Sequence, residues 1–159
     1  MVVVLHNIRS LHNVGSIFRT ADAVGIEKIY LCGITPTPMD NFGRLRLQLT
    51  KVSLGAEKIV PWDASARSAQ AILKLLKGLK KEGYKILAVE QSKRSVPYNR
   101  VKVGTKAKVV LVLGSEVKGL PSSILQKADK IVEIPMVGKK ESLNVAVAFG
   151  IVAYGLKYK

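Results

Sequence analysis

Six short apolar runs recur along the chain, and segments with helical spacing separate them. Several runs are continuous stretches of Val, Ile and Leu, which is typical of strands covered on both faces. This alternation predicts one α/β domain over residues 1–159, with a mainly parallel sheet and helices on both faces. The predicted strands are Val2–Leu5, Lys28–Leu31, Lys58–Val60, Lys85–Val89, Val109–Leu113 and Lys130–Ile134.

Apolar residues recur at helical spacing between these runs. Residues Val14–Val24 form the first stripe, with Asn13 placed as its N-terminal cap and Gly25 as its stop. Arg44–Leu49 alternates like a strand, but the neighbouring Gly43 and the preceding prolines favour a mobile surface loop. The stripe therefore predicts a helix packed on the sheet, and the alternating segment is predicted to be a loop.

A second helical stripe is basic on its outer face. It spans Ala69–Leu79, opens near Asp63 or Ser65, and is closed by Gly83. Its lysines lie between the apolar positions, as in an amphipathic helix with one face in solvent. Two shorter helices are predicted over Thr50–Ala56, ending at Gly55, and over Pro121–Ala128.

The segment 134–148 joins an apolar strand end to a turn, two short polar side chains and a strongly apolar helix. The helix is predicted over Leu143–Leu156, with Ser142 placed to cap it. A helix without a polar face is either buried on all sides or paired with another subunit. Asn144 falls inside this helix, and a buried amide must be hydrogen-bonded. A polar site is therefore expected against the most buried element.

The charge balance is the strongest compositional signal. The chain holds 26 Lys and Arg against 11 Asp and Glu, a formal net charge of +15. Lys93–Lys108 contains six basic residues and no acid, and no acidic residue precedes Asp22. A field of this sign favours a polyanion such as nucleic acid, and a merely solubilising excess of lysine is the alternative.

Several classes of protein lack their sequence signals here. The lone Cys32 forms no intrachain disulfide, and neither His6 nor His12 has a partner at metal-ligand spacing, so no metal site is predicted. There is no dinucleotide-binding GxGxxG after the first strand and no P-loop. No stretch is long enough for a membrane span, and Val2–Leu5 is too short for a signal-peptide core. These features favour a reducing, cytoplasmic compartment.

A cluster of polar residues over positions 7–21 follows the first predicted strand. Arg19 lies in an otherwise apolar, small-residue helix start, and Asn7 and Asn13 flank the loop that leads to it. Strand ends and helix N-termini offer unpaired backbone N–H groups that suit anions. An anion-binding junction and a capped helix with a surface arginine are both compatible with this cluster.

Another cluster over positions 109–120 joins a buried strand to a glycine turn with one carboxylate, Glu116. Gly114 permits close approach of a ligand to the backbone, and Gly119 permits a tight bend. Taken alone, the cluster favours an ordinary turn between a strand and a helix, with Glu116 exposed or capping.

Three ordered motifs combine these clusters: Asn13–Val14–Gly15 with Phe18–Arg19–Thr20–Ala21; Leu113–Gly114–Ser115–Glu116 with Gly119–Leu120; and Ile134–Pro135–Met136 with Ser142–Leu143–Asn144–Val145. Together they resemble the SpoU (TrmH-like) branch of the SPOUT superfamily of S-adenosyl-L-methionine (AdoMet)-dependent RNA 2′-O-ribose methyltransferases. Ser53–Glu57 is similar to the same family. The resemblance spans almost the whole chain.

The resemblance implies a C-terminal deep trefoil knot, an exception to the rule against knots. It also implies a homodimer with the last helix in the interface. Many relatives carry an N-terminal RNA-binding extension or a C-terminal tail, and this chain departs from them in that we expect one domain without an accessory RNA-binding domain. AdoMet would be held by loops at Ala88–Glu90, Gly114–Glu116 and Ile134–Leu143. The implied cofactor-binding residues are Ala88, Val89, Glu90, Gly114, Ile134, Met136, Ser142 and Leu143.

The resemblance also implies that Arg19 organises attack by a ribose 2′-hydroxyl on the methyl group. Free arginine holds its proton even above pH ~12, so Arg19 is not expected to act as a simple base. It is expected to act as a cation that stabilises the developing alkoxide or fixes an adjacent phosphate. Asn13 and Glu116 would orient Arg19 or the RNA. Ser142 and Asn144 would order the third loop.

RNA is the implied partner, with tRNA favoured and ribosomal RNA as the alternative. A non-catalytic RNA-binding module and a base methyltransferase are competing interpretations. Sequence-specific RNA-binding proteins usually contact unpaired loops. The predicted RNA contacts are Arg9, Arg44, Arg46, Lys93 and Arg94, each of which is equally compatible with a solvated basic surface.

Overall fold

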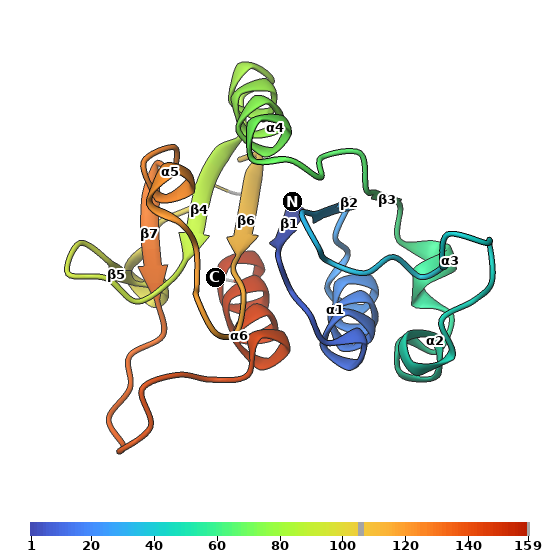
Figure 1. Cartoon of the computed structure of the whole chain (residues 1–159). Helices are drawn as coiled ribbons and strands as arrows, with labels where there is room; N and C mark the ends of the chain where they lie inside the picture. Colours follow the sequence, from blue (N-terminus) through green and yellow to red (C-terminus); the bar gives the residue numbers. More distant parts are fainter. Residues whose placement is uncertain (105–106, 159) are drawn as a thin grey trace.

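The computed structural model describes residues 1–104 and 107–158, and its centre is a seven-stranded sheet in which every strand pair is parallel (Figure 1). The strand order is β3-β2-β1-β6-β4-β7-β5. The predicted parallel sheet is confirmed. The strands are β1 (Val2–His6), β2 (Lys28–Cys32), β3 (Trp62–Asp63), β4 (Lys85–Val89), β5 (Val96–Pro97), β6 (Val109–Leu113) and β7 (Lys130–Glu133).

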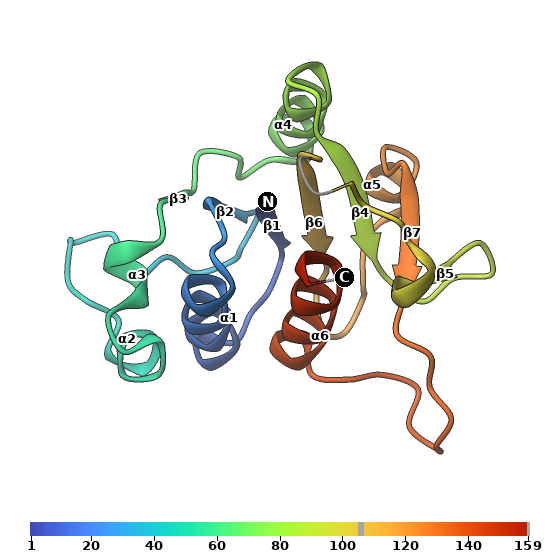
Figure 2. The same cartoon turned by 180° about the vertical axis from the view of Figure 1, so that it is seen from behind.

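Helices cover both faces of the sheet, as predicted. One apolar core joins one face of the sheet to α1, α2, α3 and α6. Helices α1 and α6 lie side by side in Figures 1 and 2. A second core joins the other face to α4 and α5. The bounds are α1 (Leu11–Val24), α2 (Leu47–Ser53), α3 (Ala56–Ile59), α4 (Ala69–Lys81), α5 (Ser122–Leu125), α6 (Val145–Lys157) and a 3₁₀ turn, η1 (Tyr98–Arg100).

Helix α1 begins earlier than predicted. The Oγ atom of Ser10 accepts a hydrogen bond from the backbone N–H of Asn13 at 3.2 Å, so Ser10 is the cap and Asn13 belongs to the first turn. Gly25 ends the helix in the left-handed conformation, as predicted. The shift leaves the Asn13 amide free to act as a side chain of the site.

Gly15 allows α1 and α2 to approach closely. A Cβ atom at Gly15 would lie 2.6 Å from the backbone oxygen of Leu49 in α2. Such a contact is far inside van der Waals distance, so only glycine fits without displacement of one helix. The glycine of the first motif therefore has a packing role.

Two predictions about the middle of the chain are wrong. Lys58–Val60 is not a strand: α3 begins after Gly55, which has φ +92°, and the buried Glu57 accepts a hydrogen bond from Ser53. The strand lies later, at β3. Helix α4 begins at Ala69, with Ser68 as its N-cap, and not near Asp63 or Ser65. There Asp63 Oδ1 accepts from the Ser65 N–H at 2.9 Å and forms a turn.

The segment predicted as a mobile loop, Arg44–Leu49, is more ordered than expected. Helix α2 begins at Leu47, and Met39 and Leu45 form an antiparallel bridge before it. The alternating apolar residues of Arg44–Leu49 therefore belong to the end of a short turn and to the start of α2.

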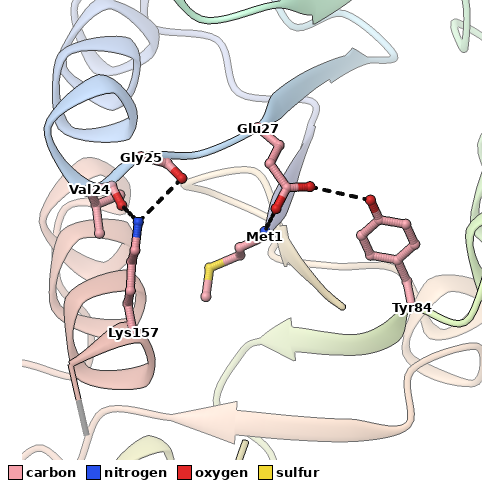
Figure 3. Close-up of polar contacts among 6 residues, drawn as sticks. All are labelled: Met1, Val24, Gly25, Glu27, Tyr84 and Lys157. Atoms are coloured by element: carbon pink, nitrogen blue, oxygen red, sulfur yellow. Dashed lines mark hydrogen bonds and ion pairs between the residues drawn. The ribbon is translucent and has the colours of Figure 1, made fainter. Parts of the chain in front are cut away.

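Helix α6 is tied to the end of α1 by its last turn. Figure 3 shows the Nζ atom of Lys157 donating to the backbone oxygens of Val24 and Gly25. A cation at this position neutralises the partial negative charge of the α1 C-terminus. This contact fixes α6 beside α1, and the two helices together form most of one layer.

The first residue is held in the same region. Its ammonium group pairs with Glu27, whose carboxylate also accepts from the Tyr84 hydroxyl at 3.4 Å (Figure 3). The hydrogen bond from the ammonium group lowers the pKa of Glu27. Within the described residues, no helix is long and apolar enough to cross a membrane.

Candidate active site

A cavity of about 580 Å³ lies where β4, β6 and β7 end. Three loops wall it: one after β4, one after β6, and the long connection from β7 to α6. Ligands of open parallel sheets bind at the carboxyl ends of the strands, and this volume is in the range of small-molecule sites. The lining residues are Val89, Glu90, Gln91, Leu113–Leu120, Leu125, Glu133, Ile134, Met136, Glu141, Ser142, Leu143, Val145 and Ala148.

The loop after β6 folds back on itself at two glycines. A Cβ atom at Gly114 would lie 2.5 Å from the carbonyl carbon of Gly119. Gly119 has φ +62°, and its N–H donates to the oxygen of Ser115 at 2.8 Å. Both glycines are therefore required by geometry, and the loop exposes its backbone to the cavity.

Glu90 holds this loop from the neighbouring strand. Its Oε2 atom accepts from the N–H of Leu120 at 2.8 Å, and its Oε1 atom accepts from the N–H of Gln91 at 3.1 Å. A carboxylate that accepts two backbone N–H groups is fixed in place. Glu90 thus lines the cavity and also shapes it.

The cavity is acidic in a strongly basic protein. Among the described residues, four glutamates line it, Glu90, Glu116, Glu133 and Glu141, against one lysine, Lys118. The chain as a whole has 26 basic and 11 acidic residues, so the lining reverses the general balance. A field of this sign favours a ligand that carries positive charge.

A chain of hydrogen bonds at the rim of the cavity joins all three motifs. The Nδ2 atom of Asn13 donates to Oε1 of Glu116 at 2.9 Å, and Nδ2 of Asn144 donates to Oδ1 of Asn13 at 3.0 Å. The backbone N–H of Arg9 also faces Glu116, at 3.4 Å from Oε2. These contacts connect the start of α1, the loop after β6 and the start of α6.

The start of α6 differs from the prediction. Asn144 is the N-cap, since its Oδ1 atom accepts from the N–H of Ala146 at 2.9 Å, and it is exposed instead of buried inside the helix. Ser142 lies two residues earlier, exposed, at the cavity wall. The capping role predicted for Ser142 therefore belongs to Asn144.

The predicted cofactor residues fall into two groups. The cavity wall includes Val89, Glu90, Gly114, Ile134, Met136, Ser142 and Leu143. Ala88 is fully buried in β4 and lies outside the wall, because its side chain packs into the core shared with α4 and α5. Sequence reasoning did not include Glu133, which accepts from the Ser95 hydroxyl at 2.7 Å across 38 positions. No local sequence pattern predicts a contact between residues as far apart in the chain as Ser95 and Glu133.

Arg19 lies outside the cavity wall. It is exposed on α1, one residue before Thr20, whose methyl group is 3.6 Å from a Cβ position at Gly150 of α6. Thr20 therefore faces α6, and Arg19 precedes it on α1. The hydrogen-bond chain groups Asn13, Glu116 and Asn144, and Arg19 takes no part in that chain.

Helix α6 keeps an apolar surface in solvent. The exposed fractions are 49% for Val147 and 42% for Tyr154, and Tyr154 stacks on the exposed Tyr158 with ring centroids 5.6 Å apart. Of the two alternatives for this helix, burial on all sides is wrong. An apolar helix face left in water is typical of an interaction surface.

The predicted RNA contacts are mostly on the surface. Arg9, Arg44, Lys93 and Arg94 are exposed, and Arg46 is half-buried, with its Nε atom lacking a hydrogen-bond partner among the described residues. One basic residue of Lys93–Lys108, Lys106, lies outside the described part of the chain.

Within 1–104 and 107–158, no three His, Cys, Asp or Glu side chains are grouped so that they could hold a metal ion. Cys32 is buried at the end of β2, and burial raises the pKa of its thiol to about 12. A thiol in this state is a poor nucleophile.

A parallel sheet with a ligand cavity at its carboxyl ends and three motifs joined at its rim defines an α/β enzyme-like domain. A family model described as the SpoU rRNA methylase family matches residues 1–154, and the chain belongs to this family. It is 34% identical over 154 residues to the tRNA (guanosine(18)-2′-O)-methyltransferase of Aquifex aeolicus, covering 97% of this chain and 67% of that relative.

Solved structures of RNA methyltransferases have a similar fold. The AdoMet-bound rRNA methyltransferase from Sinorhizobium meliloti superposes with a TM-score of 0.83 at 30% identity, over 97% of this chain and 54% of that one. A structure that addresses the 2-OH methylation of C/U34 on tRNA gives a TM-score of 0.76 at 26% identity, over 96% of this chain and 91% of that one. The chain spans two thirds of the Aquifex relative and 56% of several other curated relatives.

Proposed function

We propose that the protein transfers a methyl group from AdoMet to a ribose 2′-hydroxyl of RNA. The observation that carries this proposal is the hydrogen-bond chain from Glu116 through Asn13 to Asn144, which unites three distant motifs at the rim of one cavity. Membership of the SpoU family supports the same reaction.

The cavity fits AdoMet in volume and charge. AdoMet supplies a methyl group on a positively charged sulfonium sulfur, and four glutamates in the wall favour a cation there. The closely packed backbone at Gly114 and Gly119 would lie against the adenosine part, beside Met136 and Leu143. We assign the binding of AdoMet to the wall formed by Val89, Glu90, Gly114, Ile134, Met136, Ser142 and Leu143.

In the proposed reaction the methyl–sulfur bond breaks as a bond forms to the ribose oxygen. The hydroxyl proton passes to water, and a neutral thioether remains. Much of the acceleration comes from alignment of oxygen, methyl and sulfur, which a rigid rim provides. Asn13, Glu116 and Asn144 hold that rim, and Ser142 contributes to the wall of the third loop.

Arg19 is proposed to stabilise negative charge on the ribose oxygen or on an adjacent phosphate. Because Arg19 is exposed on α1 next to Thr20, which faces α6, we propose that a dimer formed through α6 brings it close to the second subunit. The exposed Val147 and Tyr154 support such a homodimer. A trefoil knot formed by the segment from β7 to α6 is part of the same proposal, with residues 1–159 as one SpoU-type domain.

Transfer RNA is the proposed substrate, in preference to ribosomal RNA. Support comes from the structure concerned with 2-OH methylation of C/U34 on tRNA, because this chain covers 91% of that protein. The net charge of +15 suits a polyanion. An RNA substrate and a buried free Cys32 are also consistent with a cytoplasmic location.

Two measurements on the purified protein test the function. AdoMet is expected to raise the melting temperature, and radiolabelled AdoMet is expected to transfer its methyl group to tRNA at the ribose. Absence of both effects contradicts the enzyme and favours an RNA-binding module. A methyl group recovered on a base decides for base methylation.

The role of Arg19 is tested separately. Arg19→Ala is expected to lower methyl transfer at least about 100-fold while AdoMet binding persists, because one preorganised charge is lost. Lys74→Ala removes a charge from exposed α4 and serves as the control. Turnover of Arg19→Ala at the rate of the unaltered protein removes Arg19 from the mechanism.

A further inference from the structure

The turn over residues 40–44, between β2 and α2 (Figure 1), is built around one carboxylate. The Oδ1 atom of Asp40 accepts from the N–H of Phe42 at 2.8 Å and from the N–H of Arg44 at 2.9 Å. The backbone N–H of Asp40 donates to the oxygen of Arg44 at 2.8 Å, and Gly43 has φ +75°. The tip of the turn is therefore held by its own hydrogen bonds.

The base of the turn is anchored to the rest of the protein. Met39 and Leu45 form an antiparallel bridge, and the N–H of Arg46 donates to the oxygen of Pro38 at 2.9 Å. Pro38 is buried, and α2 follows directly at Leu47. The turn is consequently a fixed projection from the surface.

The side chain displayed by this turn is a phenylalanine. Phe42 is 81% exposed. The guanidinium carbon of Arg44 lies 4.9 Å from the centroid of its ring, and Nε of Arg44 donates to Oδ2 of Asp40 at 3.0 Å. Asp40 thus orients the guanidinium group through Nε alone, and among the described residues its terminal nitrogens remain for another acceptor. An exposed apolar ring in a fixed position suggests a binding role.

We propose that the Asp40–Arg44 turn binds RNA, with Phe42 stacking on an unpaired base and Arg44 binding a neighbouring phosphate. The inference rests on the proposed RNA substrate. Aromatic rings and guanidinium planes are the usual partners of unpaired bases. The charge of the surroundings fits, since Arg46 and Lys51 follow Arg44 and the nearest acid, Asp40, is already paired.

The turn is distinct from the proposed AdoMet cavity. It follows β2, whereas the cavity lies at the ends of β4, β6 and β7, and β1, β6 and β4 separate β2 from β7 in the sheet. Strands in a sheet are about 4.8 Å apart, so β2 is about 10 Å from β6, the nearest strand of the cavity, and about 20 Å from β7, the farthest. Changes at Phe42 should therefore leave AdoMet binding unaltered.

Binding of two labelled RNAs tests the proposal: a stem–loop with an unpaired loop, and a continuous duplex of the same stem. Phe42→Ala is expected to weaken binding of the stem–loop about 5- to 100-fold and of the duplex much less. Phe42→Trp should retain stem–loop binding. Ile59→Ala, which shortens another exposed apolar side chain (66% exposed), is the control and should change neither affinity.

Salt dependence separates the two side chains. Arg44→Gln is expected to reduce the slope of log affinity against log salt concentration by about 1, because one phosphate contact is lost. Phe42→Ala should leave that slope unchanged. Unaltered stem–loop binding by Phe42→Ala, or equal losses on stem–loop and duplex, overturns the proposal.

The stability shift with AdoMet and the methyl-transfer assay are run on the same variants. A protein that binds the stem–loop through Phe42 but transfers no methyl group contradicts the proposed enzyme and upholds this contact. If the Phe42→Ala variant methylates RNA and binds the stem–loop with unaltered affinity, the proposed enzyme is upheld and the Phe42 contact is contradicted.

Discussion

Asn144 and Asn13, which are 131 positions apart in the chain, share a hydrogen bond of 3.0 Å from Nδ2 to Oδ1. The other end of each amide is also engaged: Oδ1 of Asn144 caps α6, and Nδ2 of Asn13 donates to Glu116. Each position therefore needs a side chain that both donates and accepts. This requirement is met by asparagine and not by an ionised aspartate.

Two variants of Asn144 separate its capping role from its link to Asn13. Asn144→Ala removes both and is expected to cost about 1 kcal/mol of stability. Asn144→Asp keeps a capping oxygen but cannot donate to Asn13, so the protein should retain its stability and lose methyl transfer about tenfold or more. Thermal unfolding and transfer of radiolabelled methyl to tRNA measure the two effects. Equal activity of Asn144→Asp and the unaltered protein would show that the link is dispensable.

Local hydrophobic patterns were sufficient to predict the central strands of the sheet. The run Val109–Leu113 is apolar at every position, and it forms β6 with all five residues buried. Lys58–Val60 is too short for its pattern to separate strand from helix. The left-handed Gly55 and the buried Ser53–Glu57 hydrogen bond decide for helix there, and neither is visible as hydrophobic periodicity.

The site shows a similar division. The glycine at position 114 already indicated close approach of a ligand, and the resemblance implied that the ligand is AdoMet. The structure shows that Gly114 is also required because its Cα lies against the backbone of Gly119. The exposure of Asn144 could not be foreseen, because the start of α6 depends on a partner on α1. Likewise the rigidity of the turn at Phe42 comes from hydrogen bonds to Asp40, where the sequence indicated mobility.

Gly114→Ala is expected to weaken AdoMet binding at least about tenfold. Its new Cβ atom would meet the backbone of Gly119 at 2.5 Å and push the loop out of its present shape. Gly138→Ala, in the connection from β7 to α6, adds a methyl group with nothing within 4 Å and is the matched control. Calorimetric titration with AdoMet compares the two, and similar affinities would mean that the shape of this loop does not control binding.

Gly15 and Gly78 provide a matched pair within helices. Gly15→Ala is expected to destabilise the protein by about 1–3 kcal/mol, because the methyl group meets the Leu49 oxygen at 2.6 Å. Gly78→Ala, in α4 with nothing within 4 Å, should stabilise it by roughly 0.5–1 kcal/mol through helix propensity. Urea unfolding measures both. A stabilising Gly15→Ala would mean that α1 and α2 can separate at little cost.

Stability is expected to fall as the pH drops below 6.5, and His6 contributes to that fall. Burial at the end of β1 lowers the pKa of His6 below its ordinary value of 6.5. Above pH 6.5 the ring is neutral in both folded and unfolded chains; between 6.5 and the lower folded pKa, only the unfolded chain gains the proton, which favours unfolding. His6→Gln keeps an acceptor for the Asn7 amide, now 3.3 Å from Nε2. Denaturation of this variant should depend less on pH in that window, whereas His12→Gln, at an exposed position, should behave as the unaltered protein does. An unchanged pH profile in His6→Gln would assign the acid sensitivity to other groups.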